Sequence, residues 1–308
     1  MSLVSVIVPV YNVAEFVGSC LKSLLGQTYK DIEIVVVDDG STDNTPEVCS
    51  KMSRRDPRIR VINQSNRGVS AARNKGVSEA RGEYVCFVDG DDIAHPKMVE
   101  RLVRSLESAH ADVACAGYEW FTSHYVPVDL PHESASCTFS AQAACSELLY
   151  QRIPNGPVAK LFPRVVLADV PFLESLRVGE DLLMNFDVFS RSAQVVVLEE
   201  PLYGYRQREG STMRTVRTSD RRLVVEQLEH RVSPVLSDAF ANRIFAEALY
   251  VAFEGRIAAR SIRFLLHKYR RTVVKDSKSL VQLRIYALAS YIGVSVPAVI
   301  HRWKARIR

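Results

Sequence analysis

Three carboxylates separated by a single glycine follow an apolar run of the sequence. The stretch YVCFVDGDD passes from strand-like residues directly into Asp89, Asp91 and Asp92. Like charges this close disfavour one another's ionisation unless a cation or hydrogen-bond donors compensate them. Oxygen ligands on a short turn suit Mg²⁺ or Mn²⁺, which bind a substrate's phosphates through one or two carboxylates. The alternative interpretation is a turn before a helix, because Asp and Gly are common turn residues.

Two further pairs of carboxylates are candidates for ligand binding or catalysis, because they stand at the end or at the start of predicted elements. Asp38 and Asp39 end another apolar run, and a strand-end carboxylate can accept a hydrogen bond from a ring N–H of a nucleobase. Glu180 and Asp181 open a helix-like run of Leu, Met and Phe, where acidic residues also occur as ordinary first-turn residues. Because neighbours on a helix point about 100° apart, one of this pair can face a cleft while the other supports it.

The elements that must position these acids alternate regularly. Short Val/Ile-rich runs and amphipathic stretches succeed one another, which is typical of βαβ units around a mainly parallel sheet. In such sheets ligands bind beyond the carboxyl ends of the strands, which is where the acids after Val37 and Val88 fall. We expect strands at Val4–Val10, Ile32–Val37, Ile59–Ile62, Tyr84–Val88 and Ala111–Tyr118, and helices at Ala14–Leu25, Thr45–Arg54, Val69–Ala80 and Pro96–Glu107.

Composition restricts the class of protein. With 308 residues and 47% hydrophobic content, the chain can bury a full core and is expected to carry two domains. The six cysteines show no CxxC spacing and are interpreted as reduced core thiols. No signal segment is visible after Met1, so a cytoplasmic protein is expected. The run from Ser123 to Thr138 lacks periodicity and predicts a long loop near a domain boundary.

Basic charge is concentrated at the C-terminal end. Residues Arg256 to Arg308 hold 13 Lys and Arg against one acid, whereas the rest of the chain holds 27 basic and 34 acidic side chains. The pattern beyond Thr218 is helical, and the apolar run Ile285–Ile300 is too short to span a bilayer. This asymmetry predicts peripheral attachment to an anionic membrane, unless the helices pack on the catalytic domain or on a second subunit in a homo-oligomer. Nucleic acid is not expected as a partner, because the tail lacks interleaved exposed aromatic residues.

Six segments of the sequence form a recognisable set. They are VSVIVPVYN, LKSLLGQTYKDIEIVVVDDGSTDNT, NRGVSAARNKG, GEYVCFVDGDD, VGEDLLMN and PLYGYRQREGS. Together they resemble the inverting family-2 nucleotide-sugar glycosyltransferases of the A-type fold. The resemblance implies an α/β protein with a Rossmann-like, mainly parallel sheet, flanking helices and a C-terminal helical region. It implies a catalytic domain over residues 1–215, with a nucleotide-sugar-binding half at 3–105 and an acceptor-side half at 106–215, followed by a basic helical region at 216–308.

The resemblance assigns donor-binding roles in the first half. Pro9 and Tyr11 would shape the pocket for the base and ribose, with Tyr11 as an aromatic wall. Asp39 would accept a hydrogen bond from the imide N–H of uracil. Asn66 and Arg73 match positions near the base and the phosphates.

It also assigns the metal and the catalytic base. Asp89 and Asp91 form the DxD motif, with Asp91 as the direct ligand of Mn²⁺ or Mg²⁺ and Asp89 reaching the ribose or a metal-bound water. Asp92 would be an adjacent helper. Asp181 would be the general base that takes the proton of the acceptor hydroxyl, and Glu180 would orient it or touch the acceptor.

Two arginines complete the predicted site. Arg206 and Arg208 could close over the diphosphate, since guanidinium donors match phosphate oxygens, although one of them could be surface. Many relatives carry a Trp two residues before the Lys-Leu ahead of the acidic motif. This chain has Val158-Ala159-Lys160-Leu161 there, so it departs from the family pattern at the position that would form the acceptor wall.

The predicted function is a metal-dependent inverting glycosyltransferase. It would move a sugar from a nucleoside diphosphate, with UDP favoured, to a saccharide or lipid-linked hydroxyl acceptor in surface polysaccharide or glycolipid assembly. A non-catalytic nucleotide-sugar-binding module is an alternative. A phosphatase could use a DxD nucleophile, but its DxDx(T/V) motif is not met, since Asp92 and Ile93 follow Asp91. An NAD-linked oxidoreductase would want GxGxxG after the first strand, and residues 9 to 16 contain no glycine.

Overall fold

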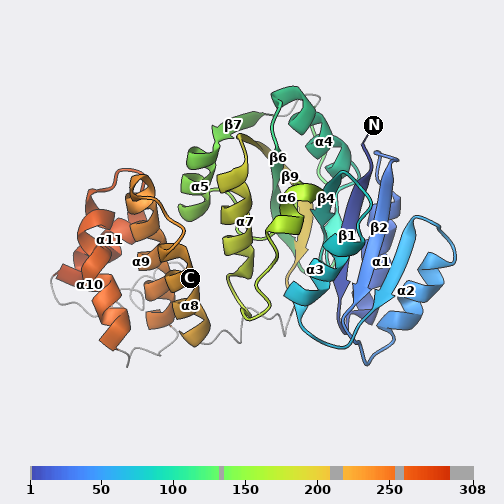
Figure 1. Cartoon of the computed structure of the whole chain (residues 1–308), viewed down its shortest axis with the longest axis horizontal. Coiled ribbons are helices and arrows are strands. Elements are labelled where there is room, and N and C mark those ends of the chain that lie inside the picture. Colours follow the sequence, from blue (N-terminus) through green and yellow to red (C-terminus); the bar gives the residue numbers. More distant parts are fainter. Residues whose placement is uncertain (1, 132–134, 209–217, 254–259, 292–308) are drawn as a thin grey trace. The chain divides into compact units, whose positions relative to one another are not determined.

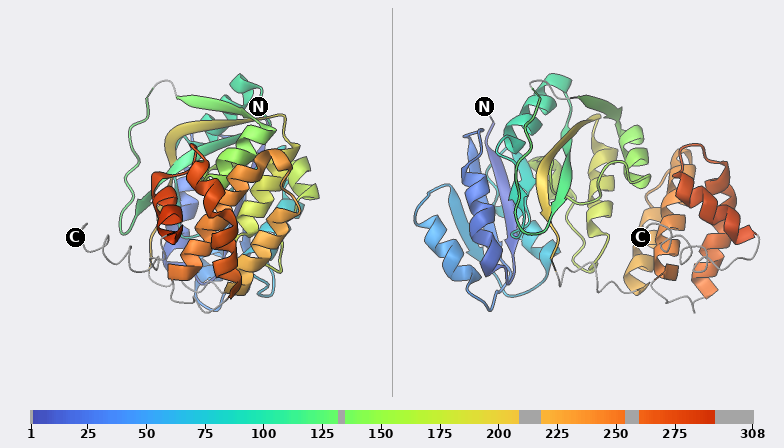
Figure 2. Two further views of the ribbon diagram at one scale, coloured as in Figure 1. Left: turned by 90° about the vertical axis from the view of Figure 1, so that its left-hand side faces the viewer. Right: turned by 180° about the vertical axis from the view of Figure 1, so that it is seen from behind.

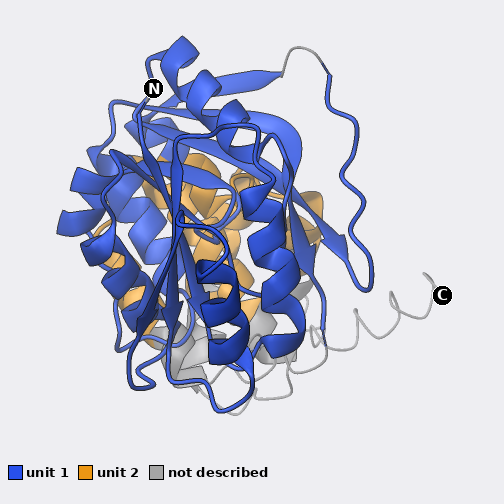
Figure 3. Ribbon diagram, turned by 90° about the vertical axis from the view of Figure 1, so that its right-hand side faces the viewer, with its two compact units in different colours: residues 1–144, 154–215 blue, residues 145–153, 216–308 orange. Residues whose placement is uncertain are grey.

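The chain forms two compact units, which are described separately. The structure is a computed structural model, and it describes residues 2–131, 135–208, 218–253 and 260–291. Unit 1 comprises residues 1–144 and 154–215, and unit 2 comprises residues 145–153 and 216–308 (Figure 3). The two ends of the predicted basic tail, residues 254–259 and 292–308, lie outside the described residues.

One sheet runs through unit 1 (Figure 1). The strands β3 (Ile59–Asn63), β2 (Ile32–Asp38), β1 (Val4–Val10) and β4 (Tyr84–Phe87) pair in parallel. Next comes β8 (Lys160–Pro163), which is antiparallel to both β4 and β6 (Val113–Phe121), and β9 (Gln194–Arg206) is parallel to β6. Because β8 is antiparallel to both of its neighbours, β6 and β9 run in the same direction as β1 to β4. All of these strands therefore end on the same edge of the sheet. We call this edge the carboxyl edge.

Two short strands extend the sheet beyond β9. The strand β5 (Ile93–Ala94) and the strand β7 (Ser136–Ser140) both pair with β9 in antiparallel fashion. In β5, Ile93 and Ala94 lie opposite Gly204 and Tyr203. The residues that directly follow the DxD motif are therefore fixed to β9.

Helices cover both faces of the sheet in unit 1, as the two further views in Figure 2 also show. The helices α1 (Ala14–Leu25), α2 (Thr45–Ser53) and α4 (Met98–Ala109) pack on the face that carries Val4, Val6 and Val8. On the other face α3 (Val69–Glu79) packs on β1 and β2, and α6 (Arg164–Asp169) contacts both α3 and α7 (Glu180–Arg191). Burial on both faces explains why β1 and β2 are nearly continuous Val and Ile runs.

The first hundred residues form the expected elements. Every strand and helix that the periodicity predicted there is present, with ends shifted by at most two residues. The predicted fifth strand is β6, which begins two residues later and ends three residues later than expected. The predicted loop from Ser123 gives way to β7 at Ser136, and β5, β8 and β9 were not predicted as strands.

Unit 2 is helical over its described residues. It contains α8 (Thr218–Glu229), the short helix η2 (Pro234–Leu236), α9 (Ser237–Phe253), α10 (Arg260–Lys275) and α11 (Val281–Tyr291). A small core of Phe245, Leu249, Val273 and Ala287 joins α9, α10 and α11. Residues 145–153, the end of α5 (Ala141–Leu149) and the turn after it, belong to this unit, whereas the sequence-based division placed them in the acceptor-side half.

Two general expectations can be compared with the structure. All six cysteines are free, and five of them are buried, which agrees with their interpretation as reduced core thiols. Among the described residues, no helix combines the length and the apolarity that a membrane span requires.

Candidate active site

A buried arginine stands at the centre of the carboxyl edge. Arg73 lies on α3, and its Nη2 is 3.1 Å from Oδ1 of Asp89, at the end of β4. Its Nη1 is 2.7 Å from Oδ1 of Asp181 and 3.6 Å from Oε1 of Glu180, at the start of α7. Burial alone would lower the pKa of Arg73, but Asp181, Asp89 and Glu180 raise it above its ordinary value. One guanidinium therefore joins the DxD motif to the predicted catalytic base.

The second carboxylate of the DxD motif faces a different arginine. Nε of Arg208 is 2.6 Å from Oδ2 of Asp91, and the Arg208 side chain is about one third exposed. Burial, and then the charge of Asp89, raises the pKa of Asp91 above its ordinary value, although Arg208 opposes the shift. Burial and the neighbouring carboxylate therefore outweigh the attraction of Arg208 for the charged form of Asp91.

Arg206 holds the turn rather than reaching away from it. Its Nε donates to the backbone oxygen of Asp91 at 2.7 Å. Its Cζ lies 4.8 Å from the ring centroid of Phe16 and 4.4 Å from that of Phe121. A guanidinium between two aromatic rings is well fixed. Of the two predicted diphosphate ligands, Arg208 is the more exposed.

Asp92 fixes the same turn through hydrogen bonds to β9. It is buried, and its Oδ2 accepts a hydrogen bond from the Tyr203 hydroxyl at 2.6 Å while its Oδ1 accepts one from the Arg206 backbone N–H at 2.8 Å. The Tyr203 hydroxyl in turn accepts from the Asp89 backbone N–H at 3.0 Å. Burial, and then the charges of Asp89 and Asp91, raises the pKa of Asp92 to about 8. Asp92 thus joins β9 to the motif, consistent with a helper role.

Glu180 and Asp181 occupy the first turn of α7 with different surroundings. Burial, and then the neighbouring Asp181, raises the pKa of Glu180 to about 8. Burial also raises the pKa of Asp181, but Arg73 opposes that shift. The side chain of Asp181 is 25% exposed, whereas that of Glu180 is 8% exposed. Asp181 is therefore the more accessible acid and has the closer cation.

A buried lysine and asparagine support this helix start. Nζ of Lys160, on β8, donates to the backbone oxygens of Pro154 and Gly156, and burial lowers its pKa while the charge of Asp181 opposes the shift. Nδ2 of Asn185 donates to the backbone oxygen of Asp181 at 2.9 Å and to that of Asn155 at 2.6 Å. The loop before β8 and the first turn of α7 are thereby fixed to each other.

The two acids at the end of β2 accept hydrogen bonds from the polypeptide itself. The buried Asp39 accepts hydrogen bonds from Gln64 Nε2 at 2.7 Å, from the Arg67 backbone N–H at 2.9 Å and from the Gly68 backbone N–H at 2.7 Å. Asp38 accepts from the Ser41 hydroxyl at 2.6 Å. Asp39 therefore shapes the loop of residues 64–68. A carboxylate offers about four lone-pair sites, so one more acceptor position is left for a nucleobase.

The other predicted donor-side residues surround this loop. Tyr11 is 46% exposed directly after β1, Pro9 lies within β1, and Asn66 is exposed in the loop. Gly40 has a φ of 73°, and a Cβ there would lie 2.8 Å from the Asn66 backbone nitrogen, so only glycine allows this close approach. The structure places Pro9, Tyr11, Asp39 and Asn66 on the β1–β3 side of the edge, with the DxD motif next to them on β4.

The DxD residues suit a divalent cation. Among the described residues, no group of three or more His, Cys, Asp or Glu side chains is arranged to ligate a metal on its own. Mg²⁺ and Mn²⁺, however, are commonly held by one or two carboxylates together with substrate phosphates. Asp89 and Asp91 are partly exposed, and burial together with the charge of Asp89 raises the pKa of Asp91, so a cation at this turn would stabilise both carboxylates. The donor set therefore fits the predicted metal.

Sequence reasoning missed several residues of this site. Tyr203, Lys160 and Asn185 were not singled out, and neither were Phe16 and Phe121, which enclose Arg206. Tyr203 stands in the quoted segment PLYGYRQREGS, so its position within that motif was an available signal. Phe16 lies on α1 and Phe121 at the end of β6. Only tertiary packing brings their rings to Arg206, so neither residue had a local signal.

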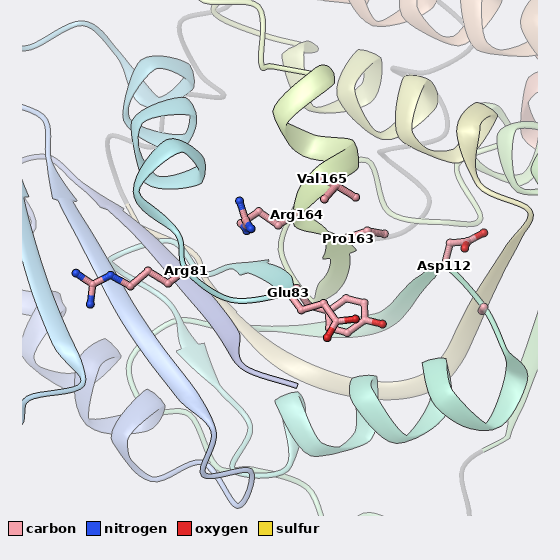
Figure 4. A pocket seen from close by; sticks show the side chains of 8 residues that line it. Arg81, Glu83, Asp112, Pro163, Arg164 and Val165 are labelled. Atoms are coloured by element: carbon pink, nitrogen blue, oxygen red, sulfur yellow. The ribbon is translucent and has the colours of Figure 1, made fainter. Parts of the chain in front are cut away.

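A separate cavity of about 500 Å³ lies at the opposite edge of the sheet (Figure 4). It is lined in part by Glu83 and Tyr84 at the start of β4, by Pro163 at the end of β8 and by Val165 on α6. Ligands of open α/β sheets bind beyond the carboxyl ends of the strands. This cavity is therefore not the candidate active site.

Fold and site together define an α/β protein with a carboxylate-rich, arginine-bridged centre at the carboxyl edge of its sheet. Residues 5–155 match the model of glycosyl transferase family 2. The chain is 37% identical to the uncharacterized glycosyltransferase EpsJ of Bacillus subtilis, over 68% of this chain and 62% of EpsJ. It is 34% identical to glycosyltransferase GlyG of Streptococcus pneumoniae, over 69% of this chain and 73% of GlyG. The chain therefore belongs to glycosyl transferase family 2.

Solved structures agree with this assignment at the level of fold. The crystal structure of residues 1–349 of TarS from S. aureus, in complex with UDP-GlcNAc, superposes with a TM-score of 0.71 at 22% identity, over 97% of this chain and 92% of that one. The predicted family, the glycosyltransferase class and the A-type fold are thus confirmed. Because less than two thirds of EpsJ is matched, its name does not fix the activity or substrates of the whole protein.

Proposed function

We propose that the protein is a metal-dependent inverting glycosyltransferase that moves a sugar from a nucleoside diphosphate to a hydroxyl acceptor. The observation that carries this proposal is the position of Arg73, which contacts Asp89 of the DxD motif and Asp181 at 3.1 and 2.7 Å. The group that would meet the donor diphosphate and the group that would meet the acceptor hydroxyl are thus separated by one guanidinium. A single displacement requires this proximity of donor and base.

Asp181 is the proposed general base. Its Oδ1 is occupied by Arg73, so Oδ2 is left to accept the proton of the acceptor hydroxyl as that oxygen attacks the anomeric carbon. Burial raises the pKa of Asp181, and Arg73 opposes that shift and so favours the charged form of the carboxylate. Glu180, whose pKa is raised to about 8, holds a proton at neutral pH and can donate a hydrogen bond within the site.

The leaving diphosphate would meet the DxD turn and Arg208. Asp91, with Asp89 beside it, would hold Mn²⁺ or Mg²⁺, and a cation there would neutralise the charge that develops on the diphosphate. Arg208 is partly exposed and could exchange its contact with Asp91 for phosphate oxygens. Attack from the face opposite the diphosphate would invert the anomeric configuration.

A UDP-sugar is the proposed donor. Asp39 keeps one acceptor position for the imide N–H of uracil, and Tyr11 offers an exposed ring beside it. TarS binds UDP-GlcNAc in the structure reported above, whereas a mannosyltransferase from Pyrobaculum calidifontis (TM-score 0.60, 16% identity) is in complex with GDP-Man and Mn²⁺. GDP-sugars are therefore the competing donors to include in a test.

A donor screen tests this function. The full chain is incubated with UDP- and GDP-sugars, with Mn²⁺, Mg²⁺ or EDTA, and released nucleotide is measured. Metal-dependent release from at least one UDP-sugar is expected, and NMR of a transfer product should show inverted configuration. Binding of UDP-sugars without any release would indicate a non-catalytic binding module. Retention of configuration would contradict the single displacement.

We further propose that unit 2 attaches the protein to an anionic membrane on the cytoplasmic side, where a lipid-linked acceptor in polysaccharide or glycolipid assembly would lie. Leu280, Val281 and Ile285 are 52%, 68% and 44% exposed at the start of α11. The exposed Lys275 and Lys278 precede them. An apolar turn next to basic side chains is the combination that binds anionic bilayers.

Liposome co-sedimentation of the full chain tests the attachment. Salt-sensitive binding to anionic but not to neutral vesicles is expected, and Val281→Ser with Ile285→Ser should weaken it. Val235→Ser is the matched control, because Val235 is 71% exposed on η2 of the same unit. Equal binding by the double variant, or no binding by the unaltered chain, would rule out this apolar turn as the membrane contact.

A further inference from the structure

Three aromatic side chains form a continuous group at the ends of β6 and β9. Trp120 and Tyr118 lie two residues apart on β6, and Tyr205 lies opposite Trp120 in the parallel pairing with β9. The ring centroids of Trp120 and Tyr205 are 4.6 Å apart, those of Tyr118 and Trp120 are 5.4 Å apart, and those of Tyr118 and Tyr205 are 5.8 Å apart. We call these three residues the aromatic platform.

One ring of the platform is open to solvent, whereas Tyr118 and Tyr205 are partly buried and pack against the core of unit 1. Trp120 is 55% exposed, although it is large and apolar. Within the described part of the chain, no hydrogen bond to the hydroxyl of Tyr118 or Tyr205 is found. Exposed aromatic groups with free polar ends are typical of binding surfaces rather than of a core. The platform therefore fits a ligand with both an apolar face and hydroxyl groups.

The platform is continuous with the proposed reaction centre. Tyr203, two residues before Tyr205 on the same strand, donates to Asp92, and the backbone N–H of Arg206 donates to the same carboxylate. Burial raises the pKa of Tyr205, as do the charges of Asp89, Asp92, Asp91 and Asp181 in turn. The phenol of Tyr205 thus lies within the electrostatic reach of both the DxD turn and the proposed base.

The order of strands separates the platform from the donor base. The sheet order is β3-β2-β1-β4-β8-β6-β9, so Tyr11 and Asp39 lie on one side of β4 and the platform lies on the other. With neighbouring strands about 4.8 Å apart, β4 and β6 are separated by roughly 10 Å. A donor that places its base at β1 and β2 and its diphosphate at β4 would leave the platform uncovered.

We propose that the aromatic platform binds the pyranose ring of the acceptor sugar, and that the hydroxyls of Tyr118 and Tyr205 take part in its recognition. This proposal rests on the proposed function, because it assigns the acceptor class of the same site. A pyranose presents one face of C–H groups, which are attracted to the negative face of an aromatic ring. Its hydroxyls supply partners for the two phenols. A lipid chain would use the ring faces but leave the phenols without partners.

Tryptophan fluorescence can report binding at the platform directly. The chain has two tryptophans, Trp120 and Trp303, so Trp303→Phe leaves Trp120 as the single indole. The full-length Trp303→Phe protein is titrated with methyl glycosides of glucose, galactose, N-acetylglucosamine and N-acetylgalactosamine in the presence of UDP and Mn²⁺. A saturable change in emission with at least one pyranoside is expected. No response to any of them, or an equal response to sorbitol, which has hydroxyls but no ring, would overturn the proposal.

Kinetics of transfer to the responding pyranoside provide the second measurement. Trp120→Ala should raise the KM for that acceptor by about threefold to tenfold, the equivalent of about 0.5–1.5 kcal/mol of aromatic contact, and Trp120→Phe should restore part of it. Calorimetric affinity for UDP with Mn²⁺ should stay unchanged in both variants. Val165→Ala is the matched control, since Val165 is 68% exposed at the opposite edge of the sheet.

The two proposals fail in different ways. If the enzyme transfers sugar to a pyranoside with the same KM in Trp120→Ala and the unaltered chain, the platform is not the acceptor site while the proposed function stands. If Trp120 responds to pyranosides but no nucleotide sugar is bound or turned over, the proposed function fails, and a carbohydrate site without the transferase activity is left.

Discussion

The two halves of the carboxyl edge satisfy their carboxylates in opposite ways. On the β1–β3 side, Asp39 is held by two backbone N–H groups and a glutamine, and Asp38 by Ser41. On the β4–α7 side, Asp91 and Asp181 face the arginine side chains Arg208 and Arg73. Backbone donors cannot leave without unfolding a loop, whereas an arginine side chain can be exchanged for a ligand. The backbone donors of the β1–β3 side therefore fix the shape of a pocket. The arginine side chains of the β4–α7 side leave carboxylates that a charged substrate or a cation can bind.

The largest expected effect is a loss of donor binding on the β4–α7 side, where the carboxylates face arginine side chains that a ligand can replace. We call this the exchangeable side and the β1–β3 side the fixed side. Asp91→Ala should abolish metal-stimulated binding of UDP, because a divalent ion held by one or two carboxylates would lose its main ligand. The fold should survive, since the Asp91 carboxylate contacts one partly exposed arginine. Isothermal calorimetry with UDP, with and without Mn²⁺, measures the effect, and Asp129→Ala in an exposed loop is the control. Unchanged metal-stimulated binding in a folded Asp91→Ala protein would remove the metal assignment.

The next effect separates the base from the donor site. Asp181→Asn should keep the affinity for UDP but slow transfer by about a hundredfold or more, as removal of a general base commonly does. Single-turnover transfer and UDP calorimetry are measured on the same preparation. Asp187→Asn, on the same helix α7, is the control and should retain activity. Near-normal turnover in Asp181→Asn would move the role of the base to Glu180.

The same comparison explains which parts of the molecule were predictable. The strands β1 to β4 and the helices α1 to α4 follow from local periodicity, and the strand-end acids could be located because parallel strands end on one edge. The partners of those acids were not predictable. Arg73 and Asp181 are 108 residues apart, and only the tertiary fold, in which α6 contacts both α3 and α7, brings them together. Likewise β9 contains Pro201 and Gly204, which local rules disfavour in strands, yet β6, β5 and β7 all pair with it.

Asp39 tests whether hydrogen bonds from the polypeptide stabilise the fixed side, between β1 and β3. Asp39→Asn replaces one acceptor oxygen by an N–H donor, so at least one of the hydrogen bonds from Gln64, Arg67 and Gly68 is lost. A buried donor left without a partner costs about 1–3 kcal/mol, and the free energy of unfolding should fall by that amount. Urea denaturation with an unchanged m-value measures it. The exposed Asp129→Asn should change stability by less than about 0.5 kcal/mol. Equal losses in both variants would mean that Asp39 does not hold the loop.

The smallest expected effect is a gain in stability on the exchangeable side. Burial and the charge of Asp181 raise the pKa of Glu180 to about 8, whereas an unfolded glutamate has a pKa of about 4.3. Between these values the folded state holds a proton that the unfolded state has released, so this group's contribution to stability declines as the pH rises. Glu180→Gln removes that decline. We expect it to be more stable than the unaltered chain at about pH 8, and this advantage should shrink as the pH falls towards about 5. Urea midpoints at both pH values, with the exposed Glu199→Gln as control, measure the difference.

A loss of stability in Glu180→Gln at about pH 8 would contradict this prediction. It would show that Arg73 stabilises the charged Glu180 as firmly as the backbone donors stabilise Asp39. The contrast between the two sides of the carboxyl edge would then not hold.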